Sequence, residues 1–142
     1  MRFLNIFLIL CAAFISYAEC HDSEKARAVA NECKDEVGAT DADVDSMFNH
    51  EPAGSSEAKC LHACVMKRFG LLNDEGKMDK EKALDILEKI HGDDEEQQNL
   101  GKEVVEACGD IEVDEDHCEA AEEYRMCIHG KAEENGFKLG RV

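Results

Sequence analysis

The chain is poor in the residues that interrupt helices and in those that build strands. Its 142 residues include one Pro and no Trp, and Phe and Tyr are rare. Alternating runs of β-branched and polar residues are missing, whereas Ala, Glu, Lys, Leu and Asp are frequent. This composition favours helices over strands. We therefore predict an all-α fold.

The sequence also lacks the motifs of common catalytic and nucleotide-binding sites. It has no G-x-S-x-G elbow, no H-E-x-x-H pair and no phosphate-binding loop. The His-Asp pair beside a double cysteine that marks secreted phospholipases is absent as well. Acidic residues outnumber basic ones by 33 to 16, and the net charge of −17 disfavours nucleic acid and anionic membrane surfaces. We expect a non-enzymatic protein with no cofactor and no nucleic-acid partner.

Long apolar stretches are missing except at the N-terminus. Residues 3–18 are almost entirely apolar, follow a positively charged start and end in small residues, which is typical of a secretory signal peptide. The stretch is short against the roughly 20 residues that a membrane span needs. We predict a signal peptide over residues 1–20, cleaved after Ala18 or Cys20, and one exported domain over residues 21–142.

The position of cleavage decides the number of cysteines in the exported protein. Cys11 leaves with the signal peptide in either case. Cleavage after Cys20 leaves six cysteines, whereas cleavage after Ala18 adds Cys20 as a seventh, unpaired thiol. Because exported cysteines form disulfides by default, the even number slightly favours cleavage after Cys20.

Apolar residues recur at helical spacing in six segments of the remaining chain. Ser, Thr or Asp precedes most of these segments and Gly follows most of them, as expected at helix ends. Gly130 is expected to end the last helix, which leaves residues 131–142 as a tail. The predicted helices cover about residues 22–36, 40–48, 55–69, 79–91, 94–108 and 115–129.

The stretch CLHAC, from Cys60 to Cys64, could be read as a metal or redox site. On an α-helix each residue advances about 100°, so the two cysteines share one face and His62 lies on the far side. The three side chains cannot converge on one zinc ion, and the C-x-x-C spacing of zinc knuckles and redox pairs is missing. We expect no metal here. Instead, each cysteine reaches a different helix, which leaves most of the fifteen pairings of six cysteines open.

The cysteine spacing from Cys33 to Cys127, C-x26-C-x3-C-x43-C-x9-C-x8-C, resembles that of the insect odorant-binding proteins, the pheromone-binding and general odorant-binding family. The predicted export, the size, the acidity and the helical pattern are similar too. The resemblance implies about six helices around an apolar ligand cavity, stapled by three disulfides. The pairs that it implies are Cys33–Cys64, Cys60–Cys118 and Cys108–Cys127.

The walls of such a cavity are expected among the apolar residues of the helices. Few aromatic residues lie outside the predicted signal peptide, so we expect a mainly aliphatic cavity. Tyr124 could donate a hydrogen bond to a ligand oxygen, or it could be half-buried with its hydroxyl in water. Ordinary core packing is the alternative for every apolar residue. The candidate lining residues are Met47, Phe48, Val65, Met66, Phe69, Leu84, Leu87, Val104, Tyr124, Ile128, Phe137 and Leu139.

The tail offers a candidate lid for the cavity. Phe137, Leu139 and Val142 alternate with polar residues and could cover bound ligand, as the tail does in some members of the family that the chain resembles. A disordered end is the alternative.

Histidine titrates near physiological pH and could couple ligand binding to acidity. Acid-triggered ligand release occurs in some members of that family, which makes His62, His117 and His129 candidates for a pH switch. Solvated histidines without any such coupling are the simpler interpretation.

The resemblance implies a secreted carrier of odorants or pheromones. Its partners would be a small hydrophobic ligand in the lymph of a sensory organ and a membrane odorant receptor, with the protein itself a monomer or weak homodimer. Two alternatives stay open. The same fold could carry hormones or lipids in haemolymph or in reproductive or gustatory secretions, or the protein could be a ligand-free interaction or defence protein.

Overall fold

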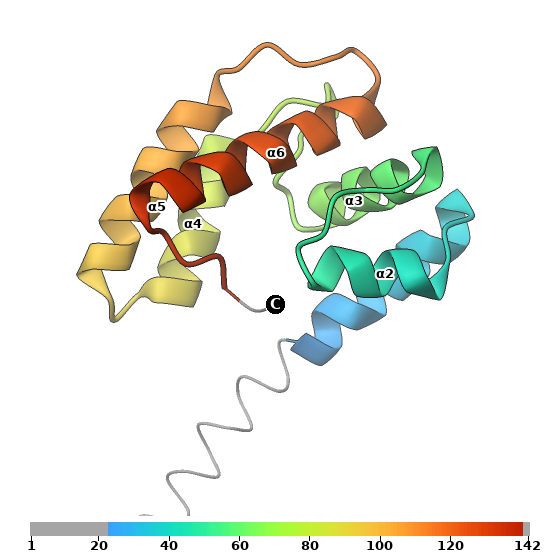
Figure 1. Ribbon diagram of the computed structural model, residues 1–142, viewed down its shortest axis with the longest axis horizontal. Helices are drawn as coiled ribbons and strands as arrows, with labels where there is room; N and C mark the ends of the chain where they lie inside the picture. Colours follow the sequence, from blue (N-terminus) through green and yellow to red (C-terminus); the bar gives the residue numbers. More distant parts are fainter. Residues whose placement is uncertain (1–22, 141–142) are drawn as a thin grey trace, which may run out of the picture.

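The computed structural model describes residues 23–140, which fold as a bundle of helices (Figure 1). The predicted signal peptide and Val142 lie outside the described residues. A first helix covers residues 23–37, and the described residues contain no β-strand, only an isolated antiparallel bridge between Leu72 and Met78. The other helices are α2 (Asp41–Phe48), α3 (Ser56–Arg68), α4 (Lys80–His91), α5 (Glu95–Gly109) and α6 (His117–Asn135).

Side-chain caps fix where the five labelled helices begin. At α2, the Thr40 hydroxyl accepts from the backbone N–H of Asp43, and the Asp43 carboxylate accepts from the backbone N–H of Thr40. Such caps typically contribute about 1 kcal/mol each by satisfying free N–H groups of the first turn. The remaining caps are Ser55, Asp79, Asp94 and Asp116.

Helix α6 is longer than predicted, because Gly130 does not end it. The helix continues to Asn135, and Gly136 ends it with φ +83° in the left-handed region. The residues after Gly130 favour helix, and Ala132 is buried, so packing outweighs the roughly 1 kcal/mol that an internal glycine costs. The tail is therefore shorter than the sequence suggests and starts at Phe137.

Helix α6 spans the molecule and packs on two groups of helices that meet along it (Figure 1). On one side it packs against α3, which also packs against α2. On the other side it packs against α5, and α4 packs only on α5 among the labelled helices. No helix in the described part of the chain is long and apolar enough to cross a membrane.

Three disulfides tie these groups together, and their pairing is the predicted one. Cys33–Cys64 joins the first helix to α3, Cys60–Cys118 joins α3 to α6, and Cys108–Cys127 joins α5 to α6. Their Cα–Cα distances are 5.7, 4.4 and 5.7 Å, within the range of ordinary disulfides. Cys60 and Cys64 leave α3 towards different helices, as helical geometry requires.

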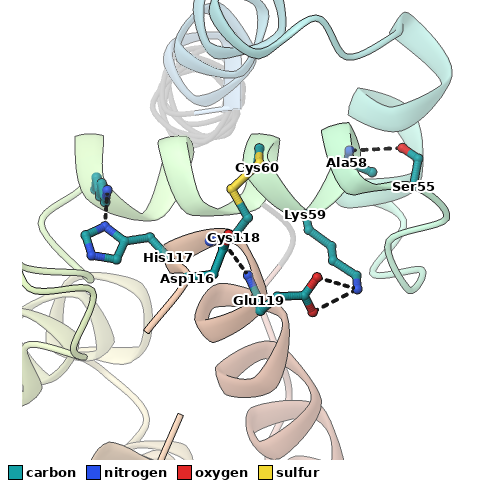
Figure 2. Close-up of a disulfide and its surroundings, with 9 residues drawn as sticks. Ser55, Ala58, Lys59, Cys60, Asp116, His117, Cys118 and Glu119 are labelled. Atoms are coloured by element: carbon teal, nitrogen blue, oxygen red, sulfur yellow. Dashed lines mark hydrogen bonds and ion pairs between the residues drawn. A yellow bond between two sulfur atoms is a disulfide. The ribbon is translucent and has the colours of Figure 1, made fainter. Parts of the chain in front are cut away.

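Polar contacts on both sides of the Cys60–Cys118 bond fix the first turn of α6 on α3 (Figure 2). Lys59 donates to both carboxylate oxygens of Glu119, at 3.0 and 2.9 Å. On the other side, the Lys67 ammonium donates to His117 Nδ1 at 2.6 Å. The disulfide and these two contacts together set the register between the two helices.

Candidate functional site

The buried apolar side chains of the described chain form two clusters. The first lies between α3, the turn around the Leu72–Met78 bridge, and α6. Met66, Ile111, Val113, Cys118 and Ile128 are partly buried against it. Its buried members are Ala63, Leu72, Met78, Ala121 and Tyr124.

The second cluster lies between the first helix, α2 and α3. Around it pack several partly buried residues, including Met47, Phe48 and Val65. The guanidinium group of Arg27 stacks over the Phe48 ring at 4.7 Å from its centroid and covers this end of the cluster. The buried members are Ala30, Cys33, Val44 and Leu61.

The structure distributes the predicted lining residues over several places. Six of them join the two clusters, Met66, Tyr124 and Ile128 in the first and Met47, Phe48 and Val65 in the second. The others are Val104, which is buried in α5, Leu87, which is buried in α4, and Phe69, Leu84, Phe137 and Leu139, which are half-buried.

A groove of about 230 Å³ opens between α4 and α5. Apolar Leu84 and Leu87 contribute to its wall. The remaining lining is polar or charged, so this groove is not the enclosed aliphatic cavity that the sequence predicts. Its other lining residues are Asp85, Glu88, Gln98 and Lys102.

The tail lies across α4 and α5 rather than away from the body. Its backbone N–H at Lys138 donates to the buried Gln97 side chain at 2.8 Å, and its carbonyl accepts from His91 Nε2 at 3.1 Å. The Phe137 ring meets the His91 ring edge-on at 5.4 Å. A Cβ at Gly101 would lie 2.9 Å from Phe137, so the missing side chain there gives the ring its place. We call residues 137–140 the strap.

Tyr124 is the buried member of the first cluster that carries a polar group, its hydroxyl. It is 1% exposed, so it is not the half-buried tyrosine that was one of the two alternatives. The ring packs among aliphatic and sulfur-containing side chains.

A polar cluster lies on another part of the α3–α6 contact. Arg125 donates from Nε and Nη2 to the two carboxylate oxygens of Glu122, at 2.8 and 2.7 Å. His62 is 5% exposed, and its Nδ1 lies 3.4 Å from Glu122 without hydrogen-bond alignment. His62 therefore points into the α3–α6 contact and not to solvent.

The environment shifts the pKa values of this cluster. Burial lowers the pKa of His62 from its usual 6.5, although Glu122 opposes the shift. Burial alone would raise the pKa of Glu122. The hydrogen bonds and charge of Arg125, together with His62 and the Ala53 backbone N–H, hold this pKa below its usual value.

Two further histidines lie at the edge of the polar cluster. The His50 and His129 rings are 5.3 Å apart, and His50 Nε2 is buried without a hydrogen-bond partner among the described residues. Burial, with the nearby charges of Arg125 and His50, lowers the pKa of His129. His117 lies elsewhere, beside Lys67 at the start of α6. No group of three or more His, Cys, Asp or Glu side chains between residues 23 and 140 could hold a metal ion.

Sequence reasoning missed parts of both the apolar and the polar interior. Leu72 and Met78 lie in a turn, where apolar residues show no helical period to mark them as buried. Glu122 and Arg125 are charged residues three positions apart on α6 and look like an ordinary surface pair. Only the nearby His62, between the apolar residues Leu61 and Ala63 in the middle of α3, hinted that a polar group is buried there.

Comparison with known proteins identifies the family. Residues 17–131 match the PBP/GOBP family. The chain belongs to this family, the insect odorant-binding proteins. General odorant-binding protein 19d of Drosophila melanogaster is 41% identical over 134 residues, which cover 92% of this chain and 89% of that protein. The relatives of this chain in the family are odorant-binding carriers and not enzymes. This agrees with the non-enzymatic function expected from the sequence.

Solved structures of odorant-binding proteins share the fold. The odorant-binding protein dmelOBP28a from Drosophila melanogaster superposes with a TM-score of 0.73 at 40% identity, over 81% of this chain and 95% of that one. The fatty acid binding protein OBP56a from the oral disk of the blowfly Phormia regina superposes with a TM-score of 0.64 at 19% identity, over 80% and 94% of the two chains. The second similarity concerns the fold alone.

Proposed function

We propose that this odorant-binding protein is a secreted carrier. It takes up small hydrophobic ligands, odorants or pheromones, from water into its apolar interior and releases them again after transport through aqueous lymph. Removal of apolar ligand surface from water supplies the driving force, about 25 cal/mol per Å² before the costs of association. A membrane odorant receptor is the proposed destination.

Membership of the family is the observation that carries this proposal. The PBP/GOBP match extends over most of the described helices, and the three disulfides hold together a bundle that contains two buried apolar clusters. A carrier role also requires export. We propose that residues 1–20 are a signal peptide that directs export, and that residues 21–142 form the exported domain. A cavity inside a small domain reduces its stability, and disulfides offset such a loss.

The proposed ligand site combines the predicted lining residues with the strap. The members in the two clusters supply an aliphatic surface with two mobile Met side chains, which suits ligands of varied shape. The strap would close the site from the side of α4 and α5. The proposed contacts are Met47, Phe48, Val65, Met66, Phe69, Leu84, Leu87, Val104, Tyr124, Ile128, Phe137 and Leu139.

Displacement of a neutral fluorescent probe tests the proposal. The purified mature protein should bind N-phenyl-1-naphthylamine with enhanced fluorescence, and aliphatic volatiles should displace the probe in a saturable manner. Reduced and unfolded protein serves as the control for nonspecific binding. Absence of probe binding, or binding that no volatile reduces, would contradict a carrier role and favour an interaction or defence protein.

A second candidate function keeps the fold and changes the fluid and the cargo. The blowfly structural neighbour is described as a fatty acid binding protein from the oral disk, so one protein with this fold comes from a tissue other than the antenna. Carriage of lipids or hormones in haemolymph or in gustatory or reproductive secretions is therefore the alternative. Localising the transcript to antennal or non-antennal tissue separates the two.

A further inference from the structure

Asn135, the last residue of α6, holds three segments together through its side-chain amide. Its Nδ2 donates to the Leu100 carbonyl at 3.1 Å and to Glu103 Oε2 at 3.3 Å, both on α5. Its Oδ1 accepts from the backbone N–H of Phe137, the first residue of the strap, at 2.9 Å. An amide carries a donor and an acceptor on one side chain, and this contact uses both. Asn135 therefore fixes the end of α6, α5 and the strap relative to one another.

The residue after Asn135 makes this amide chemically labile. Asn135–Gly136 is the only Asn-Gly dipeptide in the sequence. Asparagine is thermolabile because the backbone nitrogen of the next residue can attack its side-chain carbonyl carbon. Glycine has no Cβ to hinder this attack, and its backbone adopts the required conformations freely. The other asparagines of the exported domain, at positions 31, 49, 73 and 99, precede the larger residues Glu, His, Asp and Leu.

The reaction, deamidation, needs only the chain, water and mild base. The deprotonated backbone nitrogen of Gly136 forms a bond to Cγ of Asn135, the Cγ–Nδ2 bond breaks, and the amide nitrogen leaves as ammonia. Water then opens the cyclic imide at either of its two carbonyls. One product carries an ordinary aspartate at position 135. The other carries isoaspartate, in which the former side chain has become part of the backbone.

The folded state slows this reaction because both reacting groups are held. The Gly136 N–H donates to the Ala132 carbonyl at 2.9 Å, and the Asn135 amide is bound to α5. The last turn of α6 must therefore open before the nitrogen can attack. Helix ends near a chain terminus open at a low cost in free energy, and Gly136 is exposed. We expect slow conversion of the native protein and not complete protection.

Deamidation would turn the contact with α5 from attraction into repulsion. The new carboxylate would face the Leu100 carbonyl and the Glu103 carboxylate, two acceptors to which it has no hydrogen to donate. It would also add negative charge at the C-terminal end of a helix, beside Glu133 and Glu134, where the helix dipole disfavours an anion. Isoaspartate in addition inserts a carbon into the backbone before Phe137 and displaces its ring.

We propose that Asn135 is a deamidation site whose conversion releases the strap from α4 and α5. The strap is bound to these helices through Gln97 and His91, and both contacts depend on where α6 ends. Molecules that remain long in an extracellular fluid would thus lose the strap with age. The inference concerns the chain alone and does not depend on the proposed cargo.

Peptide mapping by mass spectrometry tests the modification. The purified mature protein, folded and with its disulfides intact, is incubated in warm, mildly alkaline buffer beside a reduced, urea-unfolded sample. Asn135 should convert before any other asparagine in both samples. It should convert about tenfold more slowly in the folded protein, the factor expected when a helix end must first open at a cost of about 1.4 kcal/mol.

Hydrogen exchange tests the effect on the strap. The Lys138 N–H donates to Gln97 at 2.8 Å and reports whether the strap is in place. Asn135→Asp at neutral pH should make this N–H exchange about tenfold faster, because a hydrogen bond is lost and like charges meet. Asn99→Asp is the matched control, since it adds the same charge at an exposed position of α5 and should leave the exchange rate unchanged. Wild-type protein aged until Asn135 has converted should exchange as fast as Asn135→Asp.

Two results would overturn the proposal. The first is conversion of another asparagine before Asn135 in the folded protein, or no conversion of folded protein while the unfolded chain converts fully. The second is a Lys138 exchange rate that is the same in the wild type, in Asn135→Asp and in the aged protein. Both results would leave the carrier role standing, because neither involves ligand.

Discussion

At the scale of single residues, Gly101 lets three parts of the molecule meet. It is buried inside α5, where a helix-favouring residue would be expected. A Cβ added there would lie 2.4 Å from Leu87 Cδ1 on α4 and 2.9 Å from the Phe137 ring of the strap. The absence of a side chain thus allows both α4 and the strap to approach α5.

A pair of glycine substitutions measures the value of this close approach. Gly101→Ala should lower the free energy of unfolding by about 1–3 kcal/mol, because the added methyl forces Leu87 and Phe137 to move. Gly130→Ala is the matched control, since its Cβ would meet nothing within 4 Å and should stabilise helix α6 by up to about 1 kcal/mol. Urea denaturation provides both values, and equal effects of the two substitutions would contradict the packing role of Gly101.

The same scale shows where sequence reasoning succeeds and where it stops. The cysteine positions are conspicuous, and their spacing resembles that of a known family closely enough to predict all three bonds. The role of Gly101 could not be predicted, because nothing in the sequence indicates which side chains from α4 and the tail will face it. Burial of Glu122 and Arg125 likewise depends on the partner surface of α3 and not on their own helix.

At the scale of elements, helix ends follow local chemistry except at the end of α6. Thr40, Ser55, Asp79 and Asp94 start helices close to where the sequence predicts. Gly130 was expected to stop α6, but Asn135 donates a hydrogen bond from its side chain to the Leu100 carbonyl of α5 and anchors the extra turn. A contact between distant segments therefore decides where α6 ends. The residues near Gly130 in the sequence give no indication of this contact.

Removal of the strap tests whether it covers the ligand site. A chain that ends after Gly136 keeps α6 but loses the half-buried Phe137 ring and the hydrogen bonds at Lys138. We expect its free energy of unfolding to fall by about 1–2 kcal/mol, the value of a partly buried aromatic ring. We also expect the bound probe to dissociate faster in stopped-flow measurements.

The control for this truncation is a chain that ends after Gly140. It retains the whole strap and removes only residues 141–142, so it should match the full-length protein. Dissociation rates that are the same for both truncated chains would argue against a strap that covers ligand.

At the scale of the whole molecule, the histidine and glutamate side chains whose pKa values are shifted all make the folded protein less stable as the pH falls. The pKa values of His62 and His129 are lowered, mainly by burial, so the unfolded chain binds protons more readily than the folded one below about pH 6.5. Glu122 also has a lowered pKa, so its contribution to stability is present above its usual value of 4.5 and is lost as the pH falls through its folded pKa. All three groups therefore favour unfolding on acidification.

The stability of the protein should consequently decrease from pH 7.5 to pH 5.5. The two histidines dominate in this window, because Glu122 titrates below it. His62→Gln removes one of them and should reduce the difference in unfolding free energy between the two pH values, whatever its effect on stability at pH 7.5. Urea titrations at both pH values measure the difference, and an identical pH dependence in wild type and variant would show that His62 does not contribute.

The all-α class, the number of helices and the family could all be predicted at this scale, because composition, period and cysteine spacing are local or countable properties of the chain. The division of the interior into two clusters could not, since it depends on how α6 packs on two groups of helices. The helical spacing of apolar residues indicates which residues face inward, but it does not indicate which of them contact one another.

The order of the disulfides along the chain has one more consequence, for resistance to proteases. The segments closed by Cys33–Cys64, Cys60–Cys118 and Cys108–Cys127 overlap one another in succession. Any single cut of the backbone between residues 33 and 127 therefore falls inside at least one closed loop, and the two pieces stay covalently joined. A nicked molecule in an extracellular fluid would thus lose one peptide bond but no part of its helical body.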